Sequence, residues 1–283
     1  MRKCKTVAAR SATALALLAT AAIATGATAP QQDLETFQDY FGKRFPKVSF
    51  DDFANGSYAL DEVLRQNWEA IEEFPPYETA IEEGGELWNT PFQNGKSYAD
   101  CFAGEQAIAN AYPRWDGNRK SVVTLPMALN ECRTSNGEQP LPYKKGKLMS
   151  LLAYVAFESR GQKTQVDIPA DDPDALAAYE QGKRFFYTRR GQLNLSCAHC
   201  HVAYPGQLLR SETLSPALGH TTHWPVYRSK WGEMGSLHRR FAGCNEQVRA
   251  KAFSPQSDEY RNLEYFLTYM SNGLPLNGPG SRK

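Results

Sequence analysis

Two cysteines and a histidine in the C-terminal half stand at the spacing of a covalent haem site. The stretch Ser196-Cys197-Ala198-His199-Cys200-His201 contains the pattern C-x-x-C-H. In c-type cytochromes the two thiols bond to one haem, and the following histidine binds the iron. The other chemistry of this spacing is a zinc half-site, which needs a second Cys or His pair. The pattern predicts one covalently bound haem c, held by Cys197 and Cys200, with His201 on the iron.

The sequence offers several candidates for the sixth ligand of the haem iron. The candidates are Met234, Met270, His220, His223, His238 and Cys244. Met234, in a Gly-bounded loop, would give an ordinary electron carrier, whereas Met270 in an apolar helical segment is typical of core packing. His220 and His223 flank a loop, at the surface or along the haem edge. His238 is expected on the solvent side of the helix that precedes Cys244.

Cys244 is the candidate with the most support. It follows Gly243, which permits close backbone approach, and Arg240 lies one helical turn earlier on the same face. A nearby guanidinium favours the thiolate, the form that ligates metals and attacks sulfur. It would also bind an anionic substrate through two hydrogen bonds. Cys244 and Arg240 are therefore the predicted catalytic pair. Basic neighbours that could add a positive field or meet haem propionates are Arg228, Lys230 and Arg239.

Composition and the N-terminus indicate an exported globular protein. The 283 residues are 22% charged with a formal net charge of +1, which suggests about two domains and argues against bulk nucleic-acid or membrane-surface binding. Residues 1–29 resemble a signal peptide, with basic residues, an apolar run near Ala12–Ala22 and cleavage between Ala24 and Ala29. The alternative, a retained anchor, is disfavoured because the apolar run is shorter than a spanning helix needs. We expect a soluble periplasmic protein, with no membrane attachment after cleavage.

Helical periodicity and breakers divide the mature chain. The spacing of Leu60, Val63, Leu64, Trp68 and Ile71 predicts a helix over residues 58–74, which Pro75-Pro76 would stop. The polar stretch 167–173 is the expected linker, and Asp172-Pro173-Asp174 is a favourable start for a helix to about Phe186. The sequence thus predicts domains at residues 30–166 and 167–283.

The two halves resemble each other, which predicts a duplicated, all-α architecture of two tandem cytochrome c-like domains. Four segments match in the same order: 96–102 with 195–201, Tyr112-Pro113 with Trp224-Pro225, 124–132 with 236–244, and 147–161 with 261–273. In the first pair, Tyr98 and Phe102 replace the first haem cysteine and the histidine. Only the C-terminal domain is therefore expected to carry haem. Chance similarity between two helical segments is the alternative.

The duplication also gives an account of the cysteines. Cys4 would leave with the signal, and the haem would take two of the five that remain. Cys101 and Cys132 correspond to Cys200 and Cys244, which would lie beside the haem. With no haem between them, a disulfide is the expected outcome in an oxidising compartment, worth about 3 kcal/mol for a loop of that size. Two unpaired buried thiols are the alternative.

Nearly all of the mature chain, and most strongly the stretch from Gly191 to Gly273, resembles the SoxA family, the cytochrome subunits of L-cysteine S-thiosulfotransferase. The resemblance depends on Cys-Ala-His-Cys-His, on Arg-Arg-Phe-Ala-Gly-Cys-Asn at 239–245, and on residues 264–273. It implies that Cys197 and Cys200 hold the haem, His201 is the proximal ligand and Cys244 is the distal ligand, found in the family as a persulfide. It also implies that Arg240 binds the sulfur anion. Because of the changes at Tyr98 and Phe102, the chain is similar to the family's monohaem type.

The resemblance further implies a reaction and partners. Thiosulfate would be coupled oxidatively to a cysteine of a SoxYZ-type carrier, and electrons would leave through the haem to a SoxX-type small cytochrome in a heterodimer. Two other functions stay open: a periplasmic electron carrier without catalytic activity, with Met234 on the iron, and a haem-based sensor with His220 or His223 on the iron.

Overall fold

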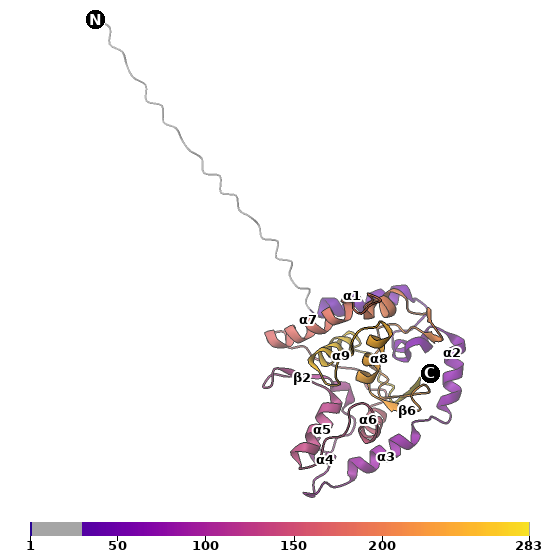
Figure 1. Cartoon of the computed structure of the whole chain (residues 1–283), viewed down its shortest axis with the longest axis vertical. Helices are drawn as coiled ribbons and strands as arrows, with labels where there is room; N and C mark the ends of the chain where they lie inside the picture. Colours follow the sequence, from indigo (N-terminus) through magenta and orange to yellow (C-terminus); the bar gives the residue numbers. More distant parts are fainter. Residues whose placement is uncertain (2–29, 283) are drawn as a thin grey trace.

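The computed structural model describes residue 1 and residues 30–282. The expected signal peptide and its cleavage site fall in residues 2–29, outside the described part of the chain. Among the described residues, no helix has both the length and the apolar character needed to cross a bilayer. Figure 1 shows α3, α4, α5 and α6 gathered at one end of the molecule and α1, α7, α8 and α9 at the other, with α2 along one side.

The described chain is mostly helical, as predicted, and the helices fall into two sets. The helices before the linker are α1 (Pro30–Arg44), η1 (Asp51–Ala59), α2 (Glu62–Glu72), α3 (Glu78–Asn89), α4 (Tyr98–Cys101), η2 (Ala109–Ala111), α5 (Leu125–Ser135) and α6 (Lys147–Glu158). Those after it are α7 (Pro173–Tyr187), η3 (His199–Ala203), α8 (Leu237–Gln247) and α9 (Asp258–Met270). α7 begins as the sequence predicts, because the Asp172 side chain accepts hydrogen bonds from the amides of Asp174 and Ala175.

Short strands were not foreseen by an all-α prediction. β1 (Arg114–Asp116) and β2 (Ser121–Val123) form one antiparallel hairpin, and β3 (Leu208–Leu209) and β4 (Glu212–Thr213) form another. β5 (Val226–Arg228) pairs antiparallel with β6 (Glu233–Gly235) and parallel with β7 (Gly280–Arg282). The strands are two or three residues long, so their alternation is too brief to stand out in the sequence.

The expected repeat is visible in how the helices cross. In each half a glycine lies where two helices touch: a Cβ on Gly84 of α3 would collide with the carbonyl of Ser150 in α6, and a Cβ on Gly182 of α7 with that of Asn262 in α9. Each half also has a hairpin, β1–β2 or β5–β6, that leads into a helix, α5 or α8. The corresponding N-caps are Thr124 and Ser236, whose hydroxyls accept hydrogen bonds from the backbone amides of Met127 and Arg239.

The buried side chains form two clusters, one in each half, but the chain's first helices belong to the second one. Phe37 and Phe41 of α1 and Phe53 of η1 pack in the same cluster as Phe266 and other residues of α9. In the reverse direction, Met234 of β6 packs in the cluster of the N-terminal half. The division into domains at residues 30–166 and 167–283 stays a prediction, and the packing places residues 30–59 with the later helices.

The cysteine pair of the N-terminal half is bonded as expected. Cys101, at the end of α4, and Cys132, in α5, form a disulfide with a Cα–Cα distance of 5.9 Å. Tyr98 and Phe102, which replace the haem-binding side chains there, stack on the buried ring of Trp88 with centroid distances of 5.9 and 5.5 Å. Aromatic packing and a covalent cross-link thus fill the place that the other half keeps for its cysteine and histidine site.

Candidate functional site

His201 is held in the form that can bind a metal. Its Nδ1 lies 2.8 Å from the carbonyl oxygen of Ser215. A carbonyl can only accept, so Nδ1 carries the proton and Nε2 keeps its lone pair. Burial lowers the pKa of His201 to about 4, an effect that Arg240 reinforces and the Ser215 contact opposes. The imidazole is therefore neutral at pH 7, as a ligand to iron must be.

The turn that carries the C-x-x-C-H pattern is fastened by α1. The guanidinium of Arg44 donates to the carbonyl oxygens of Val202 and Ala203 at 2.7 and 2.8 Å, and the Tyr40 hydroxyl donates to Val202 at 3.0 Å. These bonds satisfy carbonyls at the end of η3, directly after His201. The contact gives a functional reason for α1 to pack with the second half.

The cysteines of the C-terminal half are near one another and are not bonded to each other. Cys197, Cys200 and Cys244 are the free thiols of the described chain. Burial raises the pKa of Cys197 to about 12, with a further contribution from Cys244, and Arg190 acts in the opposite direction. The pKa of Cys200 is raised by the same two causes, burial first and Cys244 second. Both thiols of the motif are thus partly buried and lie close to Cys244.

α8 places one set of side chains in the core and another in the cavity of His201. Leu237, Phe241 and Asn245, four residues apart, are buried against the core, and the Asn245 amide donates to the Tyr260 hydroxyl at 2.8 Å. Arg240 and Cys244, also four apart, both line the cavity that contains His201. The predicted catalytic pair therefore shares one face, as its spacing indicates. A Cβ on Gly243 would meet no described atom within 4 Å, and the close approach of a haem to this glycine stays a prediction.

Arg240 is fixed by a carboxylate that sequence reasoning missed. Glu212, on β4, accepts from Arg240 Nη2 at 3.1 Å and, through its other oxygen, from Arg228 Nη2 at 2.8 Å. Burial raises the pKa of Glu212, but Arg240 and Arg228 outweigh it and lower the pKa overall. The pKa of Arg240 is raised, first by Cys244 and then by Glu212. Nη1 and Nε of Arg240 make no hydrogen bond to any described residue, so they are available to a small anion.

The cavity around these residues suits a haem. It measures about 210 Å³, adjoins a second cavity of about 120 Å³, and the two share His201, Arg240 and Cys244 among their walls. The larger one also contains Cys197 and Cys200, and the rest of its wall is mainly apolar. Its apolar side chains are Phe185, Phe186, Leu193, Leu195, Leu209, Leu214, Phe241, Leu263 and Leu267. A free imidazole nitrogen, two adjacent thiols and an apolar wall are the donor set and surroundings of a c-type haem.

The rival ligands occupy different places. Met234 and Met270 are buried in the two hydrophobic clusters, 8% and 1% exposed, and neither is among the residues that line the two cavities. His220 lines both cavities, but its ring packs edge-on against His201 with a centroid distance of 4.2 Å, and its Nε2 lies 2.9 Å from the Ser215 hydroxyl. His223 lines only the smaller cavity. The two histidines are therefore on the His201 side or farther away.

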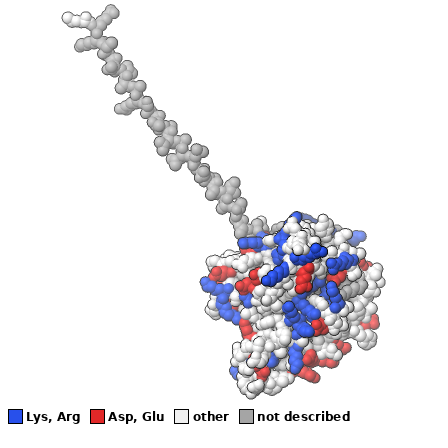
Figure 2. Space-filling view, in the orientation of Figure 1, with Lys and Arg blue, Asp and Glu red and all other residues white. Residues whose placement is uncertain are grey.

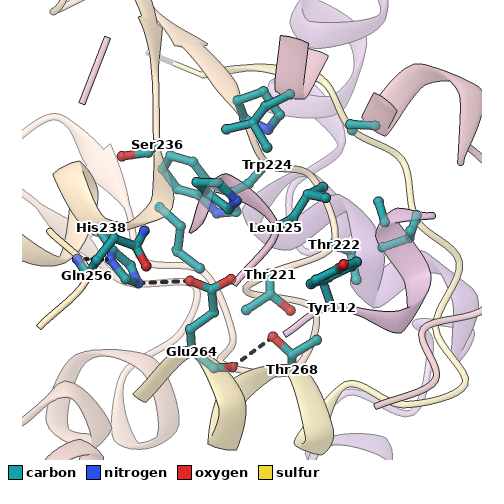
Figure 3. Close-up of a pocket in the computed structure, with 18 residues that line it drawn as sticks. Tyr112, Leu125, Thr221, Thr222, Trp224, Ser236, His238, Gln256, Glu264 and Thr268 are labelled. Carbon is teal, nitrogen blue, oxygen red and sulfur yellow. Dashed lines mark hydrogen bonds and ion pairs between the residues drawn. The ribbon is translucent and has the colours of Figure 1, made fainter. Parts of the chain in front are cut away.

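His238 is not on the solvent side of its helix, which corrects our expectation. It is 2% exposed and faces Glu264 of α9, with Nε2 and the carboxylate 2.8 Å apart (Figure 3). Its Nδ1 accepts the backbone amide of Gln256 at 3.0 Å, and the Gln256 side chain accepts the Thr124 hydroxyl at 2.7 Å. The pair borders a cavity of about 80 Å³ between the two halves, away from Cys244. It joins α8 to α9 and to the N-terminal half.

The sequence and the fold of this chain both match known proteins of one kind. A family model described as "SoxA/TsdA, cytochrome c domain" matches residues 83–164 and 181–276. The L-cysteine S-thiosulfotransferase subunit SoxA of Allochromatium vinosum is 70% identical over 257 residues, 91% of this chain and 92% of that protein. The SoxA subunit of Chlorobaculum tepidum is 57% identical over 251 residues, 89% and 87% of the two chains. The crystal structure of SoxXA from P. pantotrophus matches with a TM-score of 0.67 and 30% identity, covering 74% of this chain and 79% of that one.

Proposed function

Because this chain belongs to the SoxA family of L-cysteine S-thiosulfotransferase subunits, we propose that its Cys244 and Arg240 carry out the sulfur transfer beside a single haem c. The chain is a thiosulfotransferase subunit of the Sox system, and its cytochrome c domain implies haem c. One observation supports the assignment of residues most directly: Cys244 and Arg240 line the same cavity as His201, Cys197 and Cys200.

Cys197 and Cys200 would hold the haem through thioether bonds, and His201 and Cys244 would be its iron ligands. The number of haems, one, is supported by the N-terminal half, where a disulfide and stacked aromatic rings occupy the corresponding positions. When bound, haem c accepts electrons one at a time and passes them to another redox centre. Substrate binding and sulfur transfer belong to the chain's own side chains.

In the proposed reaction Arg240 binds the sulfonate oxygens of thiosulfate, and Cys244 acts as the sulfur nucleophile. The Cys244 thiolate and the terminal sulfur of thiosulfate form an S–S bond as two electrons leave. A carrier thiolate then attacks that terminal sulfur, which breaks the new bond, releases the Cys244 thiolate and leaves the thiosulfate group on the carrier. The apolar wall keeps water from the sulfur atoms, and Glu212 holds the Arg240 side chain in place.

The partners follow from the family and its structures. The solved relative is a SoxXA complex, which supports a small SoxX-type cytochrome as the heterodimer partner and electron acceptor. A SoxYZ-type carrier supplies the acceptor cysteine, and thiosulfate is the sulfur donor. We place the protein in the periplasm, since haem c attachment and the N-terminal signal pattern both point to export.

The test is Cys244→Ala in the complex with the small cytochrome. We expect loss of turnover with thiosulfate and carrier, retention of covalent haem, and a changed ferric spectrum because the thiolate ligand is gone. The wild-type ferric spectrum should be low-spin without the methionine-to-iron charge-transfer band at the red end. Activity that survives in Cys244→Ala would show that the catalytic assignment is wrong.

A matched control exists within the chain. Cys132 occupies the position in α5 that Cys244 occupies in α8, so the double change Cys101→Ala, Cys132→Ala removes cysteines at the equivalent place in the other half. Turnover per haem should be retained in this control. If Cys244→Ala keeps the wild-type spectrum, Cys244 is not the ligand, and the alternative of an electron carrier returns.

A further inference from the structure

A basic cavity opens beside the sulfur-transfer site. Its volume is about 510 Å³, and seven of its twelve lining residues are Lys or Arg, against a single acidic residue, Glu246. The chain as a whole carries a formal net charge of only +1. On the face seen in Figure 2, basic and acidic side chains are interspersed over most of the surface. The concentration of one sign in this cavity is therefore a local property of the fold.

Most of this positive charge is not neutralised by the chain itself. Arg228 and Arg240 share Glu212, and Arg239 pairs with Glu233 at 3.0 Å. The other four cations have no ion pair within the described residues. These four are Lys144, Arg210, Lys230 and Arg249. Setting Glu212, Glu233 and Glu246 against the seven cations leaves about four positive charges in one concave surface, where low-dielectric walls focus the field.

The cavity is continuous with the catalytic residues. Arg240 lines it and the cavity of His201 and Cys244, and Gly243, the neighbour of Cys244, lines it as well. Its other walls come from separate parts of the fold: Lys144 from the loop before α6, Arg210 from the β3–β4 turn, and Lys230 from the β5–β6 turn. Both halves of the duplication therefore contribute to it.

The size and the charge exceed what thiosulfate requires. The cavity, at about 510 Å³, is larger than a tetrahedral sulfur oxyanion needs. A single dianion would also leave about half of the positive charge unpaired. A ligand that matches both properties is a peptide segment with several carboxylates.

We propose that this cavity receives an acidic segment of the carrier protein close to its reacting cysteine, and so delivers that cysteine to Cys244. The inference rests on the proposed function and adds the recognition surface to it. Electrostatic attraction of this kind mainly accelerates encounter and depends on salt. The haem-less half takes part through Lys144, which gives it a role in choosing the partner.

The experiment measures carrier binding and turnover separately in the complex with the small cytochrome. Lys144→Glu and Lys230→Glu, alone and combined, reverse two charges whose side chains are exposed and lie outside the His201 cavity. In the double variant we expect the carrier Kd and KM to rise about tenfold or more, and their salt dependence to weaken. In Lys144→Glu alone, the KM for thiosulfate and the ferric spectrum should stay at wild-type values.

Lys96→Glu is the matched control, since Lys96 is also exposed but does not line the cavity. It should leave carrier binding at the wild-type level. Unchanged carrier binding in the double variant would overturn the proposal, and so would a rise in the thiosulfate KM alone, which would make the cavity a small-anion site. Absence of turnover in the wild type would refute the proposed function, while the binding measurement would still decide this inference.

Discussion

The Arg240 guanidinium is oriented before any substrate arrives. Glu212 takes one of its nitrogens, Arg228 shares the same carboxylate, and the remaining nitrogens face the cavity of Cys244. Such fixation reduces the loss of side-chain freedom when an anion binds. The sequence contains no pattern that predicts the contact between Glu212 and Arg240, because Glu212 lies on a hairpin 28 residues away in the chain. The position of Arg240 on the face of Cys244 could be predicted, because a four-residue helical spacing is local.

At the residue scale we predict that Arg240→Ala raises the KM for thiosulfate. Charge-assisted hydrogen bonds contribute about 1.5–3 kcal/mol, so kcat/KM for thiosulfate should fall about tenfold to a hundredfold. Steady-state kinetics with varied thiosulfate at saturating carrier measures it. Arg184→Ala, an arginine on α7 outside the cavity walls, is the control. Equal kinetics in the two variants would show that Arg240 does not bind the substrate.

At the scale of elements, the two helix crossings, α3 with α6 and α7 with α9, determine how closely each half packs. Gly84 and Gly182 allow backbones to approach where any side chain would collide with a carbonyl of the partner helix. The start of α7 and the closing apolar helices could be predicted from caps and periodicity, whereas α2 begins at Glu62, after the Asp61 cap, and not at the predicted residue 58. The close crossings could not, because a glycine within a helical pattern does not reveal which helix lies opposite it.

We predict that Gly182→Ala destabilises the protein, since the new methyl must push α7 away from Asn262 of α9. Overpacking of this kind costs about 1–3 kcal/mol. Chemical denaturation followed by tryptophan fluorescence gives the free energy of unfolding. Gly42→Ala in α1 is the control, because its Cβ would meet nothing within 4 Å and alanine is the better helix former. Similar stability for both variants would contradict a close crossing of α7 and α9.

His238 shows the limit of reasoning about one helix at a time. A polar residue near the start of α8 was expected to face solvent, but α9 brings Glu264 to it and Gln256 closes the other side of the ring. The repeat, in contrast, could be read from the order of four weak matches, and it led to the correct cysteine pair, Cys101 and Cys132. The order of the matching segments along the chain predicted the cysteine pair, whereas the pattern of a single helix did not predict the burial of His238.

For the whole molecule, the state of every mature cysteine follows from the fold. Cys101 and Cys132 are bonded to each other, and thioether bonds to haem would consume Cys197 and Cys200, which leaves Cys244. We therefore predict one titratable sulfur per chain in the denatured, unreduced holoprotein, measured with a thiol reagent. A count of three would mean that the disulfide of the haem-less half does not form in the mature protein.

The helices α1 and η1 lie in the N-terminal half of the sequence but pack with the C-terminal half. A minimal haem-bearing fragment therefore cannot be cut at Asp167, because its interior would lack Phe37, Phe41 and Phe53, and Val202 and Ala203 would lose the Arg44 clamp. A protein engineer would have to graft residues 30–59 onto it. During synthesis this segment emerges well before the last third of the polypeptide, which supplies many of the residues that cover its aromatic rings.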